Sequence, residues 1–349
     1  MQTCSELILT GNGRIEGRAG TCARPSSAQV RAQVHVVGIC ATDMALHAGA
    51  YSAPHKTAIC WGHEWSGVVE AVGSDVRQLR VGDRVTGECS LWCGECERCQ
   101  RNKNLCQHVE KFGITVDGAA RTHVLVDEKY LHRGEPDLDM GVLALTEPLA
   151  VSAQGIVAAA GAHDAALSSQ RILVIGGGMI GLGCVLLLRR MFGCDDVFVH
   201  DIEPARMKRA QALGAGILTA APATTAATDG YAGLYHAAGD RFDIVVETTG
   251  ATSALQLGLR VLMPGGTLAM LGFLPKAEIA PKDLVIKAAR IVGSIGGSGM
   301  FEKVVPWLAQ HATEARALVS HSFPAHRAEE AFAAAGDRQN GLKVQVRFA

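Results

Sequence analysis

The sequence lacks any marked excess of one charge. Its 33 Lys and Arg residues almost balance 34 Asp and Glu residues, which leaves a formal net charge of −1 over 349 residues. A basic nucleic-acid surface and an acidic tail both need such an excess, so neither is expected, and nucleic acid is not an expected partner. The chain also shows no obvious internal repeat and no long low-complexity tract, which argues against a repeat architecture.

Two further absences concern membranes and secretion. No apolar stretch approaches the roughly 18 residues needed to span a bilayer, and the N-terminus lacks the basic start and apolar run of a secretory signal. We therefore expect a cytoplasmic protein without a membrane partner. In that setting thiols stay reduced, so the 11 clustered cysteines, an odd number, indicate metal ligation rather than a disulfide framework.

The chain contains two kinds of sequence. Short apolar runs broken by glycine predict a β-rich domain in about the first 150 residues: Val34–Ile39, Val68–Val72, Arg84–Thr86 and His123–Val126. From Glu147 onward, alternating helical and strand patterns predict a parallel sheet with helices on both faces. They are Leu149–Ala160, Arg171–Ile175, Ile180–Met191, Val197–Asp201, Ala205–Leu213, Phe242–Glu247 and Thr267–Gly272. Further on, a helix is predicted at Arg327–Ala335 and a strand at Lys343–Phe348, and the Ala- and Thr-rich segment Ala220–Asp229 is expected at the surface.

A glycine-rich turn follows the first of the buried strands. Gly176, Gly178 and Gly181 form G-x-G-x-x-G directly after Ile172–Ile175 and before an apolar helix. In this context the motif predicts a dinucleotide site, because the glycines allow a tight turn, close approach of the pyrophosphate and close helix–strand packing. The helix N-terminus offers free N–H groups to the phosphates. A tight turn in a fold that binds nothing is the alternative.

Asp201 ends the next strand, 20 residues after Gly181. A carboxylate at this position accepts hydrogen bonds from ribose hydroxyls and repels a 2′-phosphate, so the sequence favours NAD over NADP. Arg206 lies five residues further on. Its side chain could pack beside the adenine or tolerate a phosphate.

Four cysteines, Cys93, Cys96, Cys99 and Cys106, lie within 14 residues. Four thiolates separated by glycine and polar residues predict a closed, tetrahedral structural zinc site. A redox C-x-x-C pair does not need four cysteines. An iron–sulfur site stays open as an alternative, because ligation by four cysteines does not exclude it. The neighbouring Cys89 is expected to be a small buried residue.

Cys40, His63 and Glu147 suggest a second kind of metal site. A soft thiolate, an imidazole and a carboxylate make a three-ligand zinc site with an open fourth position. Glu64, next to His63, is a further candidate ligand or a partner of one. Taken singly, these residues have plainer interpretations: a core cysteine, a structural histidine and a glutamate at a helix start.

Such an ion suits the oxidation of an alcohol. Hydride leaves readily only from an alkoxide, and zinc lowers the pKa of a bound oxygen by several units. Thr42, two residues after Cys40, is a candidate to accept the alcohol proton and pass it on. NAD then accepts the hydride.

These motifs together resemble the zinc-containing medium-chain dehydrogenases, the superfamily of alcohol, sorbitol and threonine dehydrogenases. The resemblance covers nearly the whole chain. Besides the cysteine cluster and the glycine turn, it is carried by Gly38–Asp43, Gly62–Gly67, Val81–Val85, Asp117–Arg121, Thr146–Ser152 and Pro264–Thr267. Glu147 stands where the alcohol dehydrogenase branch has its second cysteine, which is similar to the sorbitol and threonine branch.

The resemblance implies a GroES-like β-rich catalytic domain at residues 1–148 and 297–349, and a Rossmann NAD-binding domain at residues 149–296. It implies one catalytic zinc on Cys40, His63 and either Glu147 or Glu64, and one structural zinc on the four clustered cysteines. Cofactor contacts are implied at Met179, Ile180, Asp201, Arg206, Leu271 and Gly272. Family members are usually dimers or tetramers, so a homodimer or homotetramer is expected.

Two departures from the family pattern stand out. Many relatives carry a histidine two residues after the residue that corresponds to Asp43, where it relays the proton to solvent. This chain has Ala45 there, and either His47 or water would take over the relay. Cys99 and Cys106 are seven residues apart, where the family usually has eight.

The segments Gly62–Gly67 and Phe112–Ala120 are most similar to aminocyclitol and sugar dehydrogenases of aminoglycoside antibiotic pathways, such as the 2-deoxy-scyllo-inosamine dehydrogenases. This implies oxidation of a secondary hydroxyl of a polyol, sugar or amino sugar to a ketone. L-threonine 3-dehydrogenase and sorbitol dehydrogenase activities are alternatives. Residues suggested to line the substrate pocket are Tyr51, Trp65, Glu110 and Phe273.

Two other classes of function are compatible with a fold of this kind. A zinc-free NADPH quinone or enoyl reductase shares the scaffold, but it lacks the set formed by Cys40, His63 and Glu147. A non-catalytic protein with the same fold is a third hypothesis, and the intact metal and cofactor motifs argue against it.

Overall fold

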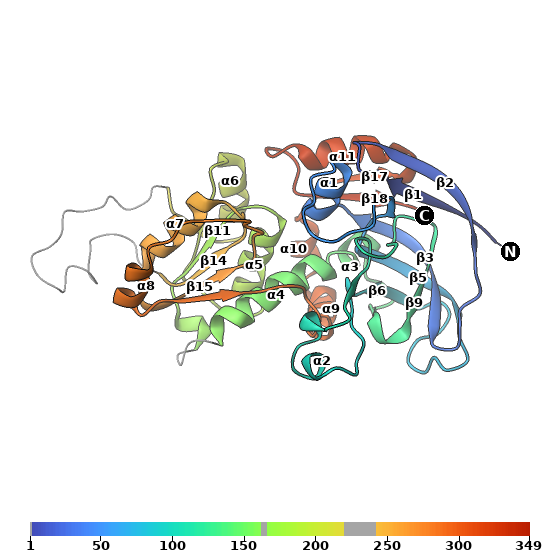
Figure 1. The fold of residues 1–349 in the computed structure, drawn as a ribbon, viewed down its shortest axis with the longest axis horizontal. Coiled ribbons are helices and arrows are strands. Elements are labelled where there is room, and N and C mark those ends of the chain that lie inside the picture. The colour runs from blue at the N-terminus through green and yellow to red at the C-terminus, as the bar shows by residue number, and fades with distance from the viewer. Residues whose placement is uncertain (1, 162–165, 220–241) are drawn as a thin grey trace, which may run out of the picture. The chain divides into compact units, whose positions relative to one another are not determined.

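The computed structural model describes residues 2–161, 166–219 and 242–349 (Figure 1). It divides into two compact units, Met1–Ala150 with Gly296–Ala349, and Val151–Ile295. The Ala220–Asp229 segment, expected at the surface, lies outside the described residues. The fold class predicted from the sequence, a β-rich domain combined with a doubly wound parallel sheet, is confirmed.

The first unit is built mainly from short strands. They are β1 (Gln2–Leu9), β2 (Ile15–Cys22), β3 (Gln29–Gly38), β4 (Ile59–Cys60), β5 (Glu64–Val72), β6 (Arg84–Gly87), β7 (Ser90–Leu91), β8 (Glu110–Lys111), β9 (His123–Asp127), β10 (Leu131–Arg133), β17 (Val319–Pro324) and β18 (Lys343–Arg347). Its helices are α1 (Ala41–His47), α2 (Glu97–Arg101), α3 (Met140–Leu143), α9 (Phe301–Gln310), α10 (Ala312–Arg316) and α11 (Ala328–Gly336). Helix α4 (Thr146–Ala160) begins in this unit and ends in the second.

A seven-stranded sheet organises the first unit, with the order β10-β6-β5-β3-β18-β17 and with β9 paired to β3. Along β3 every second side chain, including Val30, Ala32 and Val34, is buried, as expected for a strand with one face on the core. Strand β18 pairs with β3, so the C-terminal segment returns to the first unit, as the family resemblance implies.

The pairing directions in this sheet bring distant segments together. Strand β5 is antiparallel to both β3 and β6, and β18 is antiparallel to β3. The end of β3 therefore lies beside the starts of β5 and β18, and the end of β6 lies beside the start of β5. The connections that leave or enter these strand ends meet at one edge of the sheet.

The second unit contains a six-stranded parallel sheet with the order β13-β12-β11-β14-β15-β16. Its strands are β11 (Ile172–Ile175), β12 (Val197–His200), β13 (Gly216–Ile217), β14 (Phe242–Glu247), β15 (Leu262–Met270) and β16 (Arg290–Gly293). Its helices are α5 (Met179–Arg190), α6 (Pro204–Ala212), α7 (Thr252–Val261) and α8 (Pro281–Lys287). The order is that of a Rossmann sheet, whose ligand crevice lies where the order reverses, between β11 and β14.

Two expectations from the sequence are wrong. One is that no apolar stretch approaches the length of a membrane span, and the other is that all the cysteines are reduced. The apolar run Met140–Ala160 contains 21 residues with a hydropathy of 1.5, long enough to cross a membrane by length and composition. However, 78% of its most apolar stretch is buried inside the protein, as in the core helix of a folded domain.

Cys4 and Cys22 form a disulfide between β1 and β2, so the cysteines are not all free thiols.

Candidate functional site

Three potential metal ligands meet at the sheet edge of the first unit. Cys40 lies at the N-cap of α1, His63 directly precedes β5, and Glu64 is the first residue of β5. Their ligand atoms lie within 4.8 Å of one another. The structure brings them together because Gly38, at the end of β3, pairs with Glu64.

A buried carboxylate supports this group. Asp43, in the first turn of α1, accepts a hydrogen bond from the Cys40 N–H at 2.8 Å and one from the Gly62 N–H at 3.4 Å. Its Oδ1 also lies 3.8 Å from Nδ1 of His63. The Asp43 side chain therefore fixes the backbone beside both the Cys40 thiol and the His63 imidazole. This role could not be read from the sequence, although Asp43 belongs to the Gly38–Asp43 motif.

A buried lysine holds Glu64. The ammonium group of Lys343, the first residue of β18, forms an ion pair with Oε2 of Glu64 and donates a hydrogen bond to the Ile39 carbonyl at 2.9 Å. The two charged side chains are only 3% and 2% exposed. The sequence predicts Lys343 only as the first residue of a strand. Its contact with Glu64 could not be predicted, because it depends on the pairing of β18 with β3.

A second donor group overlaps the first. Ligand atoms of His63, Cys89 and Glu147 lie within 4.8 Å of one another. Cys89 follows the end of β6, and Glu147 lies in the first turn of α4. The expectation that Cys89 is a small buried residue is wrong, because its side chain is only partly buried and its thiol belongs to a group of potential metal ligands.

The electrostatics of the two groups suit a cation. Burial would lower the pKa of His63, but Cys89, Asp43 and Cys40 raise that pKa well above its ordinary value. Burial raises the pKa of Glu147 to about 7, against the opposing effect of His63. Burial also raises the pKa of Cys89 to about 11. A bound cation would stabilise the charged forms of this buried carboxylate and partly buried thiol, so the donor set fits zinc.

The four clustered cysteines form a separate group around α2. Sγ of Cys99 lies 3.6 Å from that of Cys93 and 3.3 Å from that of Cys96, and Sγ of Cys96 lies 4.0 Å from that of Cys106. Ligands about 2.3 Å from a tetrahedral zinc ion are about 3.8 Å apart, which matches these separations. The cysteine sulfur atoms that bind an iron–sulfur cluster lie farther apart than this, because the cluster contains several iron and sulfide atoms. The shortened spacing before Cys106 does not keep it out of the group.

Backbone N–H groups point at these sulfur atoms. The N–H groups of Glu95 and Cys96 approach Sγ of Cys93, and that of Cys99 approaches Sγ of Cys96, each at 3.4 Å. Hydrogen bonds from the backbone of Gln107 and Cys99 lower the pKa of Cys96 to about 6. The backbone thus favours the thiolate of Cys96, the form that binds a metal, whereas burial raises the pKa of Cys99 to about 12.

The second unit contains the predicted glycine turn between β11 and α5. Gly176 has a φ of +107°, which favours glycine, and a Cβ on Gly181 would clash with the Gly176 carbonyl oxygen. Gly178 is the N-cap of α5, and a Cβ there would meet only Nη1 of Arg206, at 4.0 Å. This open helix N-terminus fits the pyrophosphate of a dinucleotide.

Asp201 is tied to the same turn. Its Oδ2 accepts a hydrogen bond from the Gly177 N–H at 2.6 Å, and its Oδ1 accepts one from the Glu203 N–H at 2.8 Å. Nη1 of Arg206 lies 3.7 Å from Oδ2. The structure therefore brings Asp201 and Arg206 to the glycine turn.

The remaining predicted cofactor contacts also lie in the second unit. Met179 and Ile180 form the half-buried first turn of α5. The N–H groups of Leu271 and Gly272, which follow β15, donate to the Glu247 carbonyl at 2.8 and 3.1 Å. These residues lie at the C-terminal ends of β11, β14 and β15, the edge at which such sheets bind ligands.

The two predicted proton-transfer residues lie on α1. Thr42 is half-buried in its first turn. His47, the last residue of α1, lies 3.9 Å from the Glu329 carboxylate and packs against Phe332, with the ring centroids 4.8 Å apart and the rings tilted by 45°. Within the described residues, His47 joins neither donor group, so its relay role stays a prediction.

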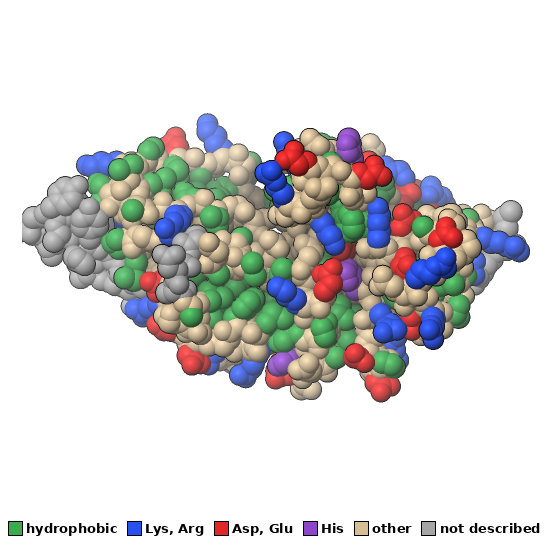
Figure 2. Space-filling model, turned by 90° about the horizontal axis from the view of Figure 1, so that it is seen from below, with side chains coloured by type: hydrophobic (Ala, Val, Ile, Leu, Met, Phe, Trp, Pro, Cys, Tyr) green, Lys and Arg blue, Asp and Glu red, His purple; other side chains and the backbone are tan. Residues whose placement is uncertain are grey.

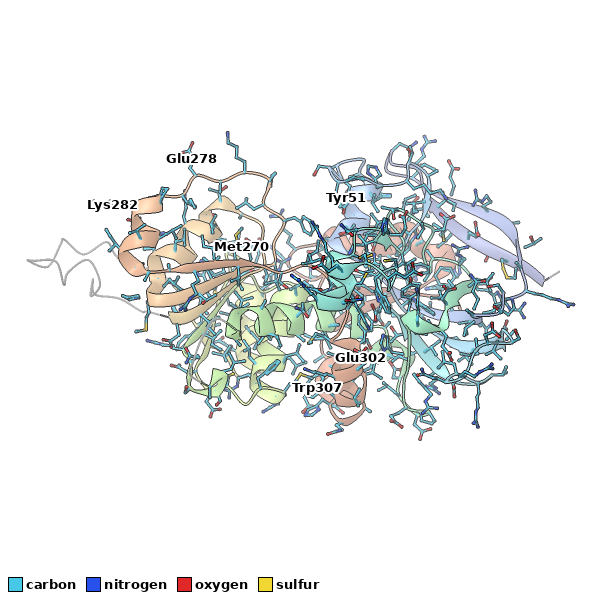
Figure 3. All side chains as sticks on the ribbon, turned by 60° about the horizontal axis from the view of Figure 1, so that its bottom comes forward. Tyr51, Met270, Glu278, Lys282, Glu302 and Trp307 are labelled. Atoms are coloured by element: carbon cyan, nitrogen blue, oxygen red, sulfur yellow. A yellow bond between two sulfur atoms is a disulfide. The ribbon has the colours of Figure 1, made fainter. Side chains whose placement is uncertain are left out.

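The suggested pocket residues have different environments. Tyr51, labelled in Figure 3, is partly buried, and burial raises its pKa. Trp65 is fully buried in the core, so the suggestion that it lines the substrate pocket is wrong. Glu110 accepts a hydrogen bond from the Thr115 hydroxyl, and Phe273 is 77% exposed in the second unit.

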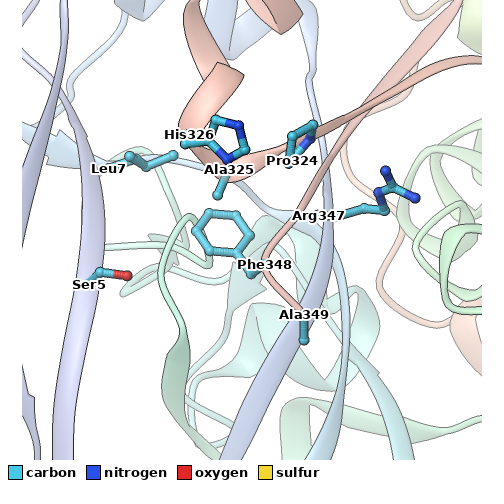
Figure 4. A pocket seen from close by; sticks show the side chains of 8 residues that line it. All are labelled: Ser5, Leu7, Pro324, Ala325, His326, Arg347, Phe348 and Ala349. Atoms are coloured by element: carbon cyan, nitrogen blue, oxygen red, sulfur yellow. The ribbon is translucent and has the colours of Figure 1, made fainter.

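A hollow elsewhere in the first unit lies between Leu7, His326, Arg347 and Phe348 (Figure 4). None of its lining residues belongs to a donor group. Figure 2 shows one face of the molecule, on which Lys and Arg side chains are interspersed with Asp and Glu side chains, in keeping with the balanced charge of the chain.

Comparisons with known proteins agree with this geometry. Residues 26–136 match the alcohol dehydrogenase GroES-like domain, and residues 179–310 match the zinc-binding dehydrogenase family. The chain is 32% identical over 319 residues to an L-threonine 3-dehydrogenase of Saccharopolyspora erythraea, with 88% of each chain covered. It is 30% identical over 327 residues to a sorbitol dehydrogenase of Bacillus subtilis, with 91% of this chain and 90% of the relative covered.

A solved structure shows the same overall fold. A zinc-binding dehydrogenase from Sinorhizobium meliloti 1021, bound to NADP, superposes with a TM-score of 0.86 at 28% identity and covers 100% of both chains. The chain therefore belongs to the zinc-containing medium-chain dehydrogenase family, in its sorbitol and threonine dehydrogenase branch, and is an oxidoreductase that acts on CH–OH groups with zinc and NAD(H) as cofactors.

Proposed function

We propose that this protein oxidises a secondary hydroxyl of a polyol, sugar or amino sugar to a ketone, with hydride transfer to NAD. The observation that carries the proposal is the convergence of Cys40, His63 and Glu64, with Glu147 close to His63, at one edge of the sheet. This is a thiolate, imidazole and carboxylate set of the kind that holds a catalytic zinc with an open position. The four-cysteine loop is proposed to hold a structural zinc.

The chain's own residues have separate tasks in this reaction. A zinc ion held there supplies Lewis acidity toward the substrate hydroxyl, and NAD supplies the hydride acceptor. Thr42 is proposed to accept the hydroxyl proton at Oγ1, because it lies two residues from Cys40 on the same helix start. Asp43 orients His63, and Lys343 holds the Glu64 carboxylate in place. His47 or water is proposed to carry the proton onward.

The preference for NAD over NADP is proposed from Asp201. Its carboxylate is fixed beside the turn by hydrogen bonds from Gly177 and Glu203. A negative charge at this position disfavours a 2′-phosphate. Nη1 of Arg206 lies 3.7 Å from the Asp201 carboxylate, and this ion pair partly neutralises the negative charge of Asp201.

The substrate class is proposed from the branch of the family. Relatives include an L-threonine 3-dehydrogenase and a sorbitol dehydrogenase. An aminocyclitol or amino-sugar substrate, in an antibiotic pathway, is proposed from the resemblance in the segments Gly62–Gly67 and Phe112–Ala120. Threonine is the second candidate substrate, favoured by the 32% identity to the threonine dehydrogenase.

A substrate screen tests the proposal. Purified protein is given NAD and, in turn, sorbitol, other polyols, cyclitols, aminocyclitols and threonine, and NADH is followed by its absorbance. We expect turnover of a polyol, cyclitol or amino sugar and about two zinc ions per chain. Turnover of threonine alone would overturn the sugar proposal, and an active protein without metal would overturn the zinc assignment.

Location and assembly are proposed as well. A cytoplasmic protein is proposed because the two donor groups and the four-cysteine loop need reduced thiols; the Cys4–Cys22 disulfide is the observation that opposes it. A homodimer or homotetramer is proposed from the family. Fractionation and light scattering test these two proposals.

A further inference from the structure

Cys89 has no task in the proposed reaction, yet it belongs to a donor group of its own. Its thiol, His63 and Glu147 form one group, whereas Cys40, His63 and Glu64 form the other. Within the described residues, His63 is the only member that the two groups share, and no group contains both thiols. A single ion would thus meet two alternative ligand sets that share one imidazole.

The position of Cys89 is set by the sheet and by its neighbours. Strand β6 pairs with β5 with Thr86 opposite Ser66, which brings Glu88 and Cys89, the two residues after β6, toward the start of β5. The Phe112 N–H donates to the Cys89 carbonyl at 2.9 Å, and the Cys89 thiol donates to the Phe112 carbonyl at 3.8 Å. On the N-terminal side, the Glu88 N–H donates to the Tyr130 carbonyl at 2.9 Å. The thiol is therefore presented to His63 by an ordered backbone.

The two groups are chemically alike. Each offers one sulfur, one imidazole nitrogen and one carboxylate oxygen, the donor types that zinc accepts. His63 and Glu147 are 4% and 6% exposed, and Cys89 is partly buried, as Cys40 is in the first group, so the two groups are enclosed to a similar degree. Unlike Glu64, whose Oε2 forms an ion pair with Lys343, Glu147 has no ion pair with a Lys or Arg within the described residues. A cation at the second position would provide a charge partner for this carboxylate.

We propose that Cys89 is a zinc ligand and that the catalytic ion has two positions that share His63, one with Cys40 and Glu64 and one with Cys89 and Glu147. The inference rests on the proposed function, since it concerns the same ion. When the ion binds at the second position, a Zn–S bond forms and the thiol proton passes to solvent, without a change in oxidation state. Each of the two carboxylates that the sequence left as alternative ligands then serves a different position.

Cobalt substitution tests the second position. Protein in which Co²⁺ replaces zinc is compared as wild type, Cys40→Ser, Cys89→Ser and the double variant. The readouts are bound metal per chain and the thiolate-to-cobalt charge-transfer absorption, with the four-cysteine loop as a constant background. We expect each single variant to keep the second metal ion and an absorption above that background. The double variant should lose that absorption.

Controls separate the possible failures. Cys60→Ser removes a buried thiol of the same unit. Its Sγ lies 3.6 Å from the Gly118 carbonyl oxygen, and it belongs to no donor group among the described residues. It should match the wild type. Cys89→Ala should reproduce Cys89→Ser, and NADH binding and thermal unfolding check that each variant is folded.

The outcomes are distinguishable. If Cys40→Ser alone removes all absorption above the background while Cys89→Ser leaves the spectrum unchanged, Cys89 is not a ligand and the inference is overturned, although the proposed function stands. If the wild type binds only the metal of the four-cysteine loop, the proposed function itself fails.

Discussion

The ammonium group of Lys343 and the carboxylate of Glu64 form an ion pair in which neither side chain is more than 3% exposed. Burial would lower the pKa of Lys343, but Glu64 raises it, so the lysine stays charged. Residues almost 280 positions apart in the chain thus meet next to the metal ligands, because β18 and β5 both lie beside β3.

The first prediction concerns this pair. Lys343→Met leaves the Glu64 carboxylate buried without its charge partner, and breaking a buried pair in this way costs about 3–5 kcal/mol. Urea unfolding of the first unit should show a loss of this size. As a control, Arg316→Met breaks the exposed pair with Asp139, 2.7 Å long, and should cost at most about 1 kcal/mol. Equal losses for the two variants would show that burial of the Glu64 pair has no special effect.

The second prediction concerns the four-cysteine loop. Cys96→Ser removes one of four mutually close sulfur atoms, so the chain should lose about one zinc ion. NADH should still bind, because the glycine turn lies in the other unit. Metal analysis by mass spectrometry and NADH fluorescence measure the two effects. An unchanged zinc content would mean that the loop does not hold the metal.

Some features of the site could be predicted because their signal is local. The glycine turn lies within one strand–turn–helix segment, so the spacing of Gly176, Gly178 and Gly181 and the neighbouring apolar residues are enough to identify it. The four-cysteine loop likewise lies within 14 residues, and its donors are all of one type. The fold class followed from the change in periodicity near Glu147.

Other features could not be predicted, because they depend on strand pairing. Cys89 approaches His63 only through the register of β6 on β5, and Lys343 approaches Glu64 only through the place of β18 beside β3. A single sequence without these registers shows Cys89 as one more small apolar residue. Burial was also unpredictable: Trp65 adjoins Glu64 in the same motif, yet its side chain points into the core.

The third prediction concerns cofactor preference. Asp201→Ala removes the carboxylate that accepts hydrogen bonds from Gly177 and Glu203. We expect KM for NAD to rise about tenfold, or about 1.4 kcal/mol, and the preference for NAD over NADP to narrow. Steady-state kinetics with both cofactors measure this. Asp195→Ala, whose side chain is 98% exposed, is the control and should leave both values unchanged. A preserved preference in Asp201→Ala would refute the role of this carboxylate.

The fourth prediction concerns Thr42. If its hydroxyl accepts the substrate proton, Thr42→Val should lower kcat by about 10²–10⁴-fold, the usual contribution of positioned proton transfer. Thr42→Ser keeps a hydroxyl at the same place in α1 and should retain most of the activity. Zinc content and NADH binding should be unchanged in both variants. Equal activity of the Val and Ser variants would show that the proton leaves by another route.

The last prediction concerns pH and stability. Burial would raise the pKa of Glu128, but its carboxylate accepts hydrogen bonds from the backbone N–H groups of Arg77, Gln78 and Leu79, at 2.6 to 3.1 Å, and these hold its pKa below the ordinary value. A carboxyl whose pKa is lower in the folded state than in the unfolded state stabilises the fold above its unfolded pKa, about 4.3. This contribution is lost as the pH falls through the folded pKa.

Glu128→Gln should therefore be less stable than the wild type at neutral pH, and the difference should shrink as the pH is lowered from about 5 toward 3, because the wild-type carboxylate is then protonated as well. Thermal or urea unfolding of the first unit across this range measures the difference. Glu16→Gln, at an exposed position on β2, should follow the wild type at every pH. A stability difference between Glu128→Gln and the wild type that does not change with pH would show that the three backbone hydrogen bonds do not favour the charged carboxylate over the neutral one.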